Sequence, residues 1–116
     1  MKESVTDGAS YYGRIFARCG GLAEAVKQGI IESGADFELK AISCDGIEQC
    51  RTALAKAKAG KLDANFIEGM ACTGGCIGGS GCLTHGIDRG RTEIDKYGKA
   101  GKDSISASLS AMKDEF

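Results

Sequence analysis

Several features are scarce or missing in this sequence of 116 residues. It has no proline, and its 18 glycines gather near cysteines, so no stretch has the composition of an interdomain linker. Neither sign of charge is in excess, since 15 Lys and Arg are balanced by 16 Asp and Glu, giving a formal net charge of -1. This balance argues against a nucleic-acid-binding face. No apolar run is long enough to cross a bilayer, so we expect neither a nucleic acid nor a membrane as a partner.

The N-terminal stretch Met1–Ser10 has neither the basic start nor the apolar centre of a signal peptide, so we expect a cytoplasmic protein. That expectation bears on the six cysteines. In a secreted domain they would indicate a disulfide framework. In a reducing compartment the same number indicates metal or redox chemistry, and the missing signal favours this second interpretation.

The spacing of apolar residues predicts a small α/β domain. Helical spacing in Leu22–Ile30 and Ile47–Ala57 predicts two helices. Gly34 and Gly60 are their expected stops, and Asp45 is the expected N-cap of the second. Apolar centres or strict alternation predict strands at 11–18, 37–41 and 62–67. This alternation favours a parallel sheet of about three to four strands flanked by helices.

Two further helical patterns, at 87–99 and 103–113, predict a C-terminal helical segment that packs on the sheet, with Asp103 as a possible cap. We therefore expect a single α/β domain over residues 11–113. A flexible N-terminal segment, 1–10, and a short tail, 114–116, complete the chain.

The most informative stretch is Glu68–Gly79, which reads EGMACTGGCIGG. Cys72 and Cys76 lie here in a glycine-rich loop that follows the last predicted strand. Thiolates are soft ligands suited to iron–sulfur clusters and zinc, and glycine lets the backbone approach a bulky group closely. Open α/β sheets bind their ligands at the carboxyl ends of strands. The loop therefore predicts a metal-cluster site with Cys72 and Cys76 as ligands.

A second interpretation uses a longer run of possible ligands with the spacing C-x3-C-x5-C-x2-H. Its members are Cys72, Cys76, Cys82 and His85. Four such ligands are enough for zinc, although zinc sites usually begin with a tighter C-x2-C pair. This alternative is a stand-alone metal-binding (zinc or iron–sulfur) or redox-sensing module. A lone histidine is more often a surface or capping residue, which weighs against His85 as a ligand.

The other cysteines carry weaker signals. Cys19 and Cys50 fit the ordinary behaviour of a thiol as a small buried apolar residue, and Cys44 is undecided. A phosphate-binding role for Gly74–Gly81 is weakly supported, because the segment lacks the Gly-Lys-Ser/Thr ending of a P-loop.

The stretch Glu68–Cys76 resembles the third signature of FeFe-hydrogenases, which begins E-x-M-A-C-x-G-G-C. The order of features upstream is also similar, with a Gly20-Gly21 turn opening a helix, then a strand, and a helix ending in Ala59–Lys61. The resemblance covers roughly residues 11–86 and points to the C-terminal lobe of the large, catalytic subunit.

The resemblance implies an oxidoreductase with an H-cluster, in which a 4Fe–4S cubane is joined through a cysteine sulfur to a di-iron centre. By resemblance, Cys72 ligates the cubane and Cys76 is the bridging thiolate at the catalytic centre. Met70 packs beside the di-iron centre, and Gly78 and Gly79 let the loop close over it. The implied reaction is the reversible interconversion of hydrogen with protons and electrons, supported by a ferredoxin-like electron donor or acceptor.

The two other signatures of the family, T-S-C-C-P and M-P-C-x-x-K-x-x-E, are absent, and the segment after Gly79 diverges. We therefore expect a fragment of a longer hydrogenase-like protein whose remaining catalytic domain is its partner. With two of four cubane ligands, the isolated chain is expected to hold no cluster stably and to be inactive. We also expect 72–81 to be the most mobile internal segment without a cluster.

Overall fold

The structure is a computed structural model, and it describes residues 8–83 and 86–113. The elements in chain order are α1 (Tyr11–Arg14), α2 (Gly21–Ser33), β1 (Ala41–Asp45), α3 (Ile47–Lys58), β2 (Phe66–Met70), the 3-10 turn η1 (Cys76–Gly78), α4 (Ile87–Lys99) and α5 (Ile105–Lys113). The two helices predicted from apolar spacing are α2 and α3, and the two predicted near the C-terminus are α4 and α5.

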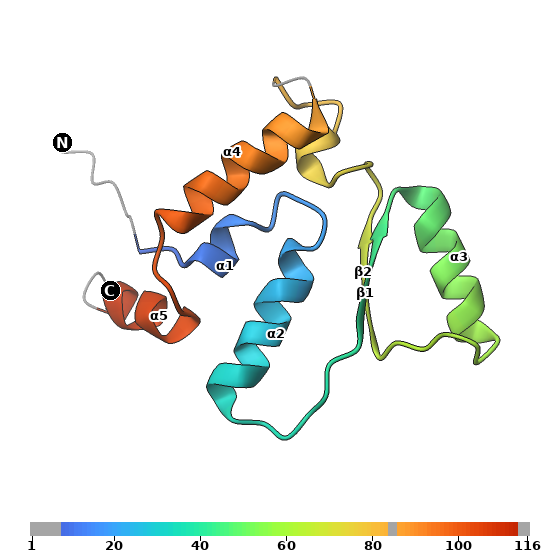
Figure 1. Cartoon of the computed structure of the whole chain (residues 1–116), viewed down its shortest axis with the longest axis horizontal. Coiled ribbons are helices and arrows are strands. Elements are labelled where there is room, and N and C mark those ends of the chain that lie inside the picture. The colour runs from blue at the N-terminus through green and yellow to red at the C-terminus, as the bar shows by residue number, and fades with distance from the viewer. Residues whose placement is uncertain (1–7, 84–85, 114–116) are drawn as a thin grey trace.

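A two-stranded parallel sheet lies at the centre of the fold. β1 and β2 pair in register from Ala41 opposite Phe66 to Asp45 opposite Met70. Helices α2 and α3 lie on opposite faces of this sheet (Figure 1). The mixed helix–strand class and the parallel pairing are thus confirmed. The expected three to four strands are not confirmed, since the sheet has two strands within residues 8–83 and 86–113.

The predicted strand at 11–18 is wrong, because a helical turn forms there instead. The Ser10 side chain accepts a hydrogen bond from Gly13 N at 3.1 Å and so caps α1 (Tyr11–Arg14). Both remaining strands begin about four residues later than predicted. Asn65 explains the shift, because its side chain bonds Lys40 N at 2.7 Å and Glu38 O at 2.8 Å and ties the two incoming segments together before pairing starts.

Two expected helix caps are also wrong. The N-cap of α3 is Gly46, with φ 93°, and the Asp45 carboxylate instead accepts a hydrogen bond from Gly74 N in the cysteine loop. At the start of α5, the Ser104 side chain rather than Asp103 accepts from Ala107 N at 3.0 Å. Gly34 does end α2, in the left-handed conformation at φ 70°.

The two C-terminal helices pack mainly on other helices rather than on the sheet. α4 packs against α1 and η1, while α5 packs against α2 (Figure 1). The last turn of α2 contacts α5 through Glu32. Its carboxylate accepts hydrogen bonds from Ile105 N at 2.9 Å and Ser106 N at 2.8 Å. A carboxylate at a helix N-terminus satisfies donors that the helix itself leaves unpaired.

Docking of α5 is expected to depend on pH through Glu32. The hydrogen bonds from Ser106 and then Ile105 lower the pKa of this carboxyl from 4.5 to about 2. A depressed pKa means that the contribution to docking is complete above pH 4.5 and is lost as the pH falls through about 2. NMR signals of Ile105 and Ser106 in an acid titration measure this loss.

The variant Glu32→Gln should abolish this titration, while Asp103→Asn, at an exposed carboxyl beside the same helix, should leave it in place. An unchanged titration of Ile105 and Ser106 in Glu32→Gln would refute the assignment.

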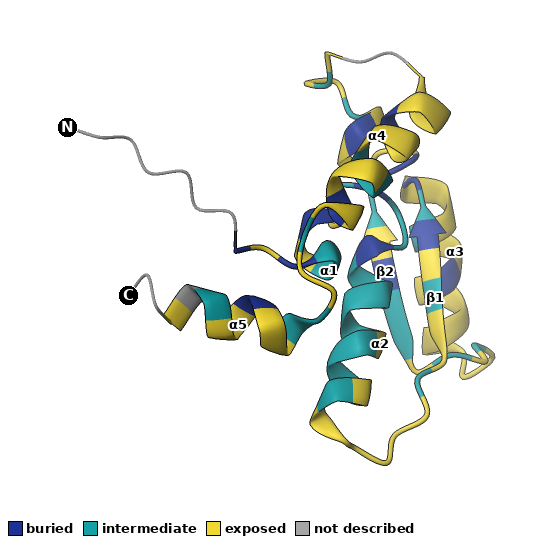
Figure 2. Cartoon of the chain, turned by 60° about the vertical axis from the view of Figure 1, so that its left-hand side comes forward, coloured by how far each residue is buried: buried dark blue, intermediate teal, exposed yellow. Residues whose placement is uncertain are grey.

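The apolar core is small for a chain of this length. Among the described residues, the buried hydrophobic side chains are Ile15, Cys44, Ala53 and Ile77. Much larger apolar side chains stay in contact with water, such as Phe37 at 54% and Leu54 at 61% exposure. Figure 2 shows that most of the buried residues lie near the sheet and the turn that joins α1 to α2. In the part of the chain that is described, no helix combines the length and apolar character needed to cross a bilayer.

Candidate functional site

The cysteine loop leaves the carboxyl end of β2, as the sequence predicted. It folds into successive tight turns, in which Gly75 N donates to Cys72 O and Gly79 N to Cys76 O, both at 3.0 Å. Gly74 and Gly75 have φ of 88° and 90°, a region that side-chain-bearing residues rarely adopt. Glycine at these two positions is therefore needed for the course of the loop itself.

The rest of the chain holds this loop from two sides. The turn after α1 contributes two hydrogen bonds, from Cys19 N to Gly74 O at 3.0 Å and from Ile77 N to Ala17 O at 3.2 Å. From the end of β1, Asp45 accepts a hydrogen bond from Gly74 N. The Ile77 side chain is buried at 8% exposure. The loop therefore has protein contacts that define its conformation, and its expected mobility remains a prediction for measurement.

The predicted ligands Cys72 and Cys76 are both exposed, while Met70 is half-buried. Gly79 lies against the first of them, since a Cβ built on Gly79 would be 3.5 Å from Cys72 Sγ. A Cβ on Gly78 would be 2.0 Å from Thr73 O, so the backbone itself excludes a side chain there. The roles of Met70, Gly78 and Gly79 toward a cofactor stay predictions.

The remaining cysteines lie apart from this exposed pair in burial or environment. Cys44 is buried on β1, and Cys50 on α3 is half-buried with its Sγ 3.7 Å from Met70 O. Burial raises the pKa of the Cys44 thiol, and the neighbouring Cys50 and Glu68 add to the effect. Burial likewise raises the pKa of Cys19, as do the negative charges of Asp45 and Glu68. These environments suit structural thiols.

The longer ligand run is described only in part. Cys82 is half-buried, whereas His85 lies outside the described residues. Among residues 8–83 and 86–113, no group of three or more His, Cys, Asp or Glu side chains is arranged to hold a metal ion. The site thus presents two exposed soft donors, a set that fits a cluster only when further ligands come from elsewhere.

Sequence reasoning missed the role of Glu68, which is 1% exposed. Its carboxylate accepts from Gly20 N at 2.8 Å, Leu22 N at 2.9 Å and Ser43 Oγ at 2.8 Å. It therefore caps the N-terminus of α2 from the middle of β2, two residues before that strand ends at Met70. One feature of the sequence could have indicated this role. Gly20 is the N-cap residue of α2 and has no side chain, so the cap must come from elsewhere in the chain.

Arg18 was also missed, and it is 2% exposed beside the loop. It pairs with Asp95 of α4 at 2.5 Å and with Glu24 of α2 at 3.1 Å. Burial alone would lower its pKa, but the bonds to Asp95 and Glu24 more than offset this, so the guanidinium stays charged. Arg18 thus links α2 and α4 to the turn after α1, which is hydrogen-bonded to the loop. No local pattern could have found a partner 77 positions away.

Thiol reactivity is expected to separate the loop pair from the structural cysteines. Cys72 and Cys76 should be alkylated by iodoacetamide at least about tenfold faster than Cys44, because they are exposed and Cys44 is buried with a raised pKa. Timed quenching followed by peptide mass spectrometry measures each rate. In urea the rates should converge, and an equally fast Cys44 in the folded protein would contradict the described burial.

Fold and loop together define an α/β domain that presents a pair of exposed thiols at the carboxyl end of its parallel sheet. The sequence matches the family described as iron only hydrogenase large subunit, C-terminal domain, over residues 1–80, and the chain belongs to this family. The matched range includes both loop cysteines and ends before α4. A comparison with the curated proteins finds no match. The family implies iron–sulfur cofactors in the parent protein.

Proposed function

We propose that this chain forms part of the catalytic domain of an FeFe-hydrogenase-like oxidoreductase, to which it contributes two cysteine ligands of the H-cluster. The observation that carries this proposal is the exposed pair Cys72 and Cys76 on the loop at the carboxyl end of β2, within the family match. When bound, the H-cluster would supply the reversible conversion of hydrogen into protons and electrons.

The chain's own residues would orient the two thiolates. Cys72 would ligate the cubane and Cys76 the junction with the di-iron centre, beside Met70. The contacts of Gly74 with Asp45 and Cys19 would fix the loop before any cluster arrives. Such preorganisation lowers the cost of placing both ligands at once.

The proposal requires a partner, since a cubane takes four protein ligands and this loop supplies two. The partner would be the remainder of the catalytic domain, and a ferredoxin-like protein would exchange electrons with the parent enzyme. A cytoplasmic location belongs to the same proposal.

The isolated chain is expected to remain colourless, or to bind iron weakly, after anaerobic reconstitution with iron and sulfide. Iron analysis and the visible absorption spectrum measure this result, with the double variant Cys72→Ser/Cys76→Ser as the baseline. Reconstitution together with the remaining part of the catalytic domain should give a cluster that depends on both cysteines. A stoichiometric, stable 4Fe–4S spectrum on the monomer would contradict the shortage of ligands argued above.

The alternative, a stand-alone zinc, iron–sulfur or redox-sensing module, uses Cys72, Cys76, Cys82 and His85. A zinc titration with thiol counting separates it from the hydrogenase proposal. Tight zinc binding that is lost in both Cys82→Ser and His85→Ala would favour the module. Binding that is weak, or indifferent to these two substitutions, would favour the hydrogenase part.

A further inference from the structure

The outer edge of β1 has backbone groups that pair with no other strand among residues 8–83 and 86–113. Lys40 O accepts from Asn65 N at 2.9 Å, and Gly46 N donates to Met70 O at 2.8 Å, so the even-numbered residues of this segment face β2. The N–H and C=O groups of Ala41 and Ser43 therefore face the other side. The structure pairs neither of these two residues with a further strand in the part of the chain that it describes.

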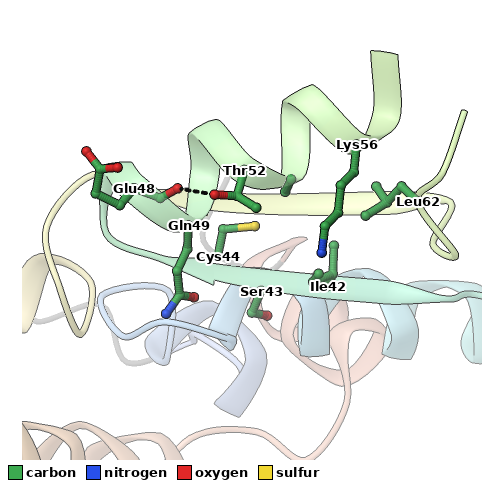
Figure 3. A pocket seen from close by; sticks show the side chains of 9 residues that line it. Ile42, Ser43, Cys44, Glu48, Gln49, Thr52, Lys56 and Leu62 are labelled. Carbon is green, nitrogen blue, oxygen red and sulfur yellow. Dashed lines mark hydrogen bonds between the residues drawn. The ribbon is translucent and has the colours of Figure 1, made fainter. Parts of the chain in front are cut away.

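A groove flanks this edge on each face of the sheet. On the α3 side, a cavity of about 300 Å³ is lined by residues that include Ile42, Cys44 and Leu62, and Lys56 extends toward β1 at its border (Figure 3). On the α2 side, a cavity of about 380 Å³ is lined by residues that include Lys27 and Ser43. Both helices thus extend over space that β1 and β2 do not fill.

The position of the cysteine loop indicates the direction of a strand that would fill this space. The carboxyl end of β1 lies beside the loop, because Asp45 accepts a hydrogen bond from Gly74 N. A strand parallel to β1 would end at the same place. The residues that follow it would then approach Cys72 and Cys76, where further ligands are required. All-parallel sheets occur almost only where helices cover both faces, and α2 and α3 cover both faces here.

We propose that the outer edge of β1 is a docking site for a parallel β-strand from the polypeptide that supplies the remaining cluster ligands. The identity of that polypeptide rests on the proposed function, whereas the strand pairing rests on the edge and its two grooves. The strand places apolar side chains against Ile42 and Leu62 on the α3 side. It places small or polar side chains beside Ser43 and Lys27 on the α2 side.

The first test uses a defined probe, an acetylated peptide of alternating valine and threonine with lysine at both ends. Added to the ¹⁵N-labelled metal-free chain, it should shift the amide signals of Ala41 and Ser43 and slow their hydrogen exchange at least about tenfold at saturation. The signals of Ile67 and Gly69, on the opposite edge of the sheet, should stay unchanged. No change at Ser43, or an equal change at both edges, would overturn the proposal.

Orientation is tested with a nitroxide label at either end of the same peptide. A label at the carboxyl end should broaden the signals of Thr73 and Gly74, and a label at the amino end those of Leu39 and Asn65. The reversed pattern would show antiparallel pairing and would overturn the proposal.

Two matched substitutions on α3 test the groove. Thr52 lines the cavity on the α3 side, and Ala55 is exposed on the same helix and does not line it. Thr52→Arg should weaken peptide binding at least about tenfold, while the same charge at Ala55→Arg should change it by less than about twofold. Equal effects of the two variants would contradict binding in the groove.

These peptide experiments use no metal, so they fail or succeed independently of the proposed function. If the peptide binds at β1 but a cluster forms without Cys72 and Cys76, the hydrogenase proposal is refuted and the strand proposal stands. If a cluster forms through Cys72 and Cys76 but the peptide does not bind at Ser43, the strand proposal is refuted and the hydrogenase proposal stands.

Discussion

Replacing Glu68 by alanine is expected to lower the free energy of unfolding by about 3–5 kcal/mol, because each buried donor left without a partner costs roughly 1–3 kcal/mol. The three donors concerned are Gly20 N, Leu22 N and Ser43 Oγ. Small domains have only about 5–15 kcal/mol of stability in total, so the loss is a large fraction of the whole. Urea unfolding followed by circular dichroism measures it.

Two comparisons make the Glu68 experiment specific. Glu68→Gln keeps the shape and one acceptor oxygen, so it should cost less than Glu68→Ala. Glu38→Ala removes an exposed carboxylate from the same part of the chain and should change stability by less than about 0.5 kcal/mol. A Glu68→Ala variant as stable as Glu38→Ala would show that the capping bonds contribute nothing.

Local patterns predicted the helices well and the strands poorly. The apolar spacing in α2 and α3 is set by contacts along one helix face, and glycine stops such as Gly34 act locally. The start of β1 depends instead on Asn65, which lies 25 residues further along the chain and bonds Lys40. The alternation at 37–41 indicated a strand, but Phe37 is 54% exposed in an unpaired segment.

The sequence likewise located the cysteine loop but not the residues that hold it. Two thiols in a glycine-rich loop after a strand form a local pattern, and the structure places both at the carboxyl end of β2. The residues that hold the loop are not local. Asp45 was expected to cap α3, yet it bonds Gly74 instead. Arg18 and Glu68 join elements through contacts that only the folded chain brings together.

These contacts connect the thiol loop to the stability of the domain. Glu68 lies on the strand that leads into the loop, and it fixes the start of α2. Arg18 lies in the turn that bonds the loop through Cys19 and Ala17, and it is fixed by Asp95 on α4. The loop that carries the two thiols is therefore attached to the segments whose bonds join the sheet to its helices.

Replacing Gly78 by alanine is expected to displace the loop from the turn after α1. The new Cβ would be 2.0 Å from Thr73 O, which is closer than any non-bonded contact allows, so the Thr73 carbonyl must move. The bonds of Gly74 O to Cys19 N and of Ile77 N to Ala17 O should then weaken. Overpacking of this kind costs about 1–3 kcal/mol, equivalent to roughly 5- to 160-fold in the opening equilibrium of the loop.

Amide hydrogen exchange at Cys19 and Ile77 measures this opening without any metal, and the rate should rise at least about fivefold in Gly78→Ala. Gly81→Ala is the matched control in the same segment, because a Cβ there has no neighbour within 4 Å and the residue's φ lies outside the left-handed region. If Gly78→Ala exchanged no faster than Gly81→Ala, the close packing of the loop on Thr73 would not determine its conformation. The chain by itself would then not fix the position of the two thiols.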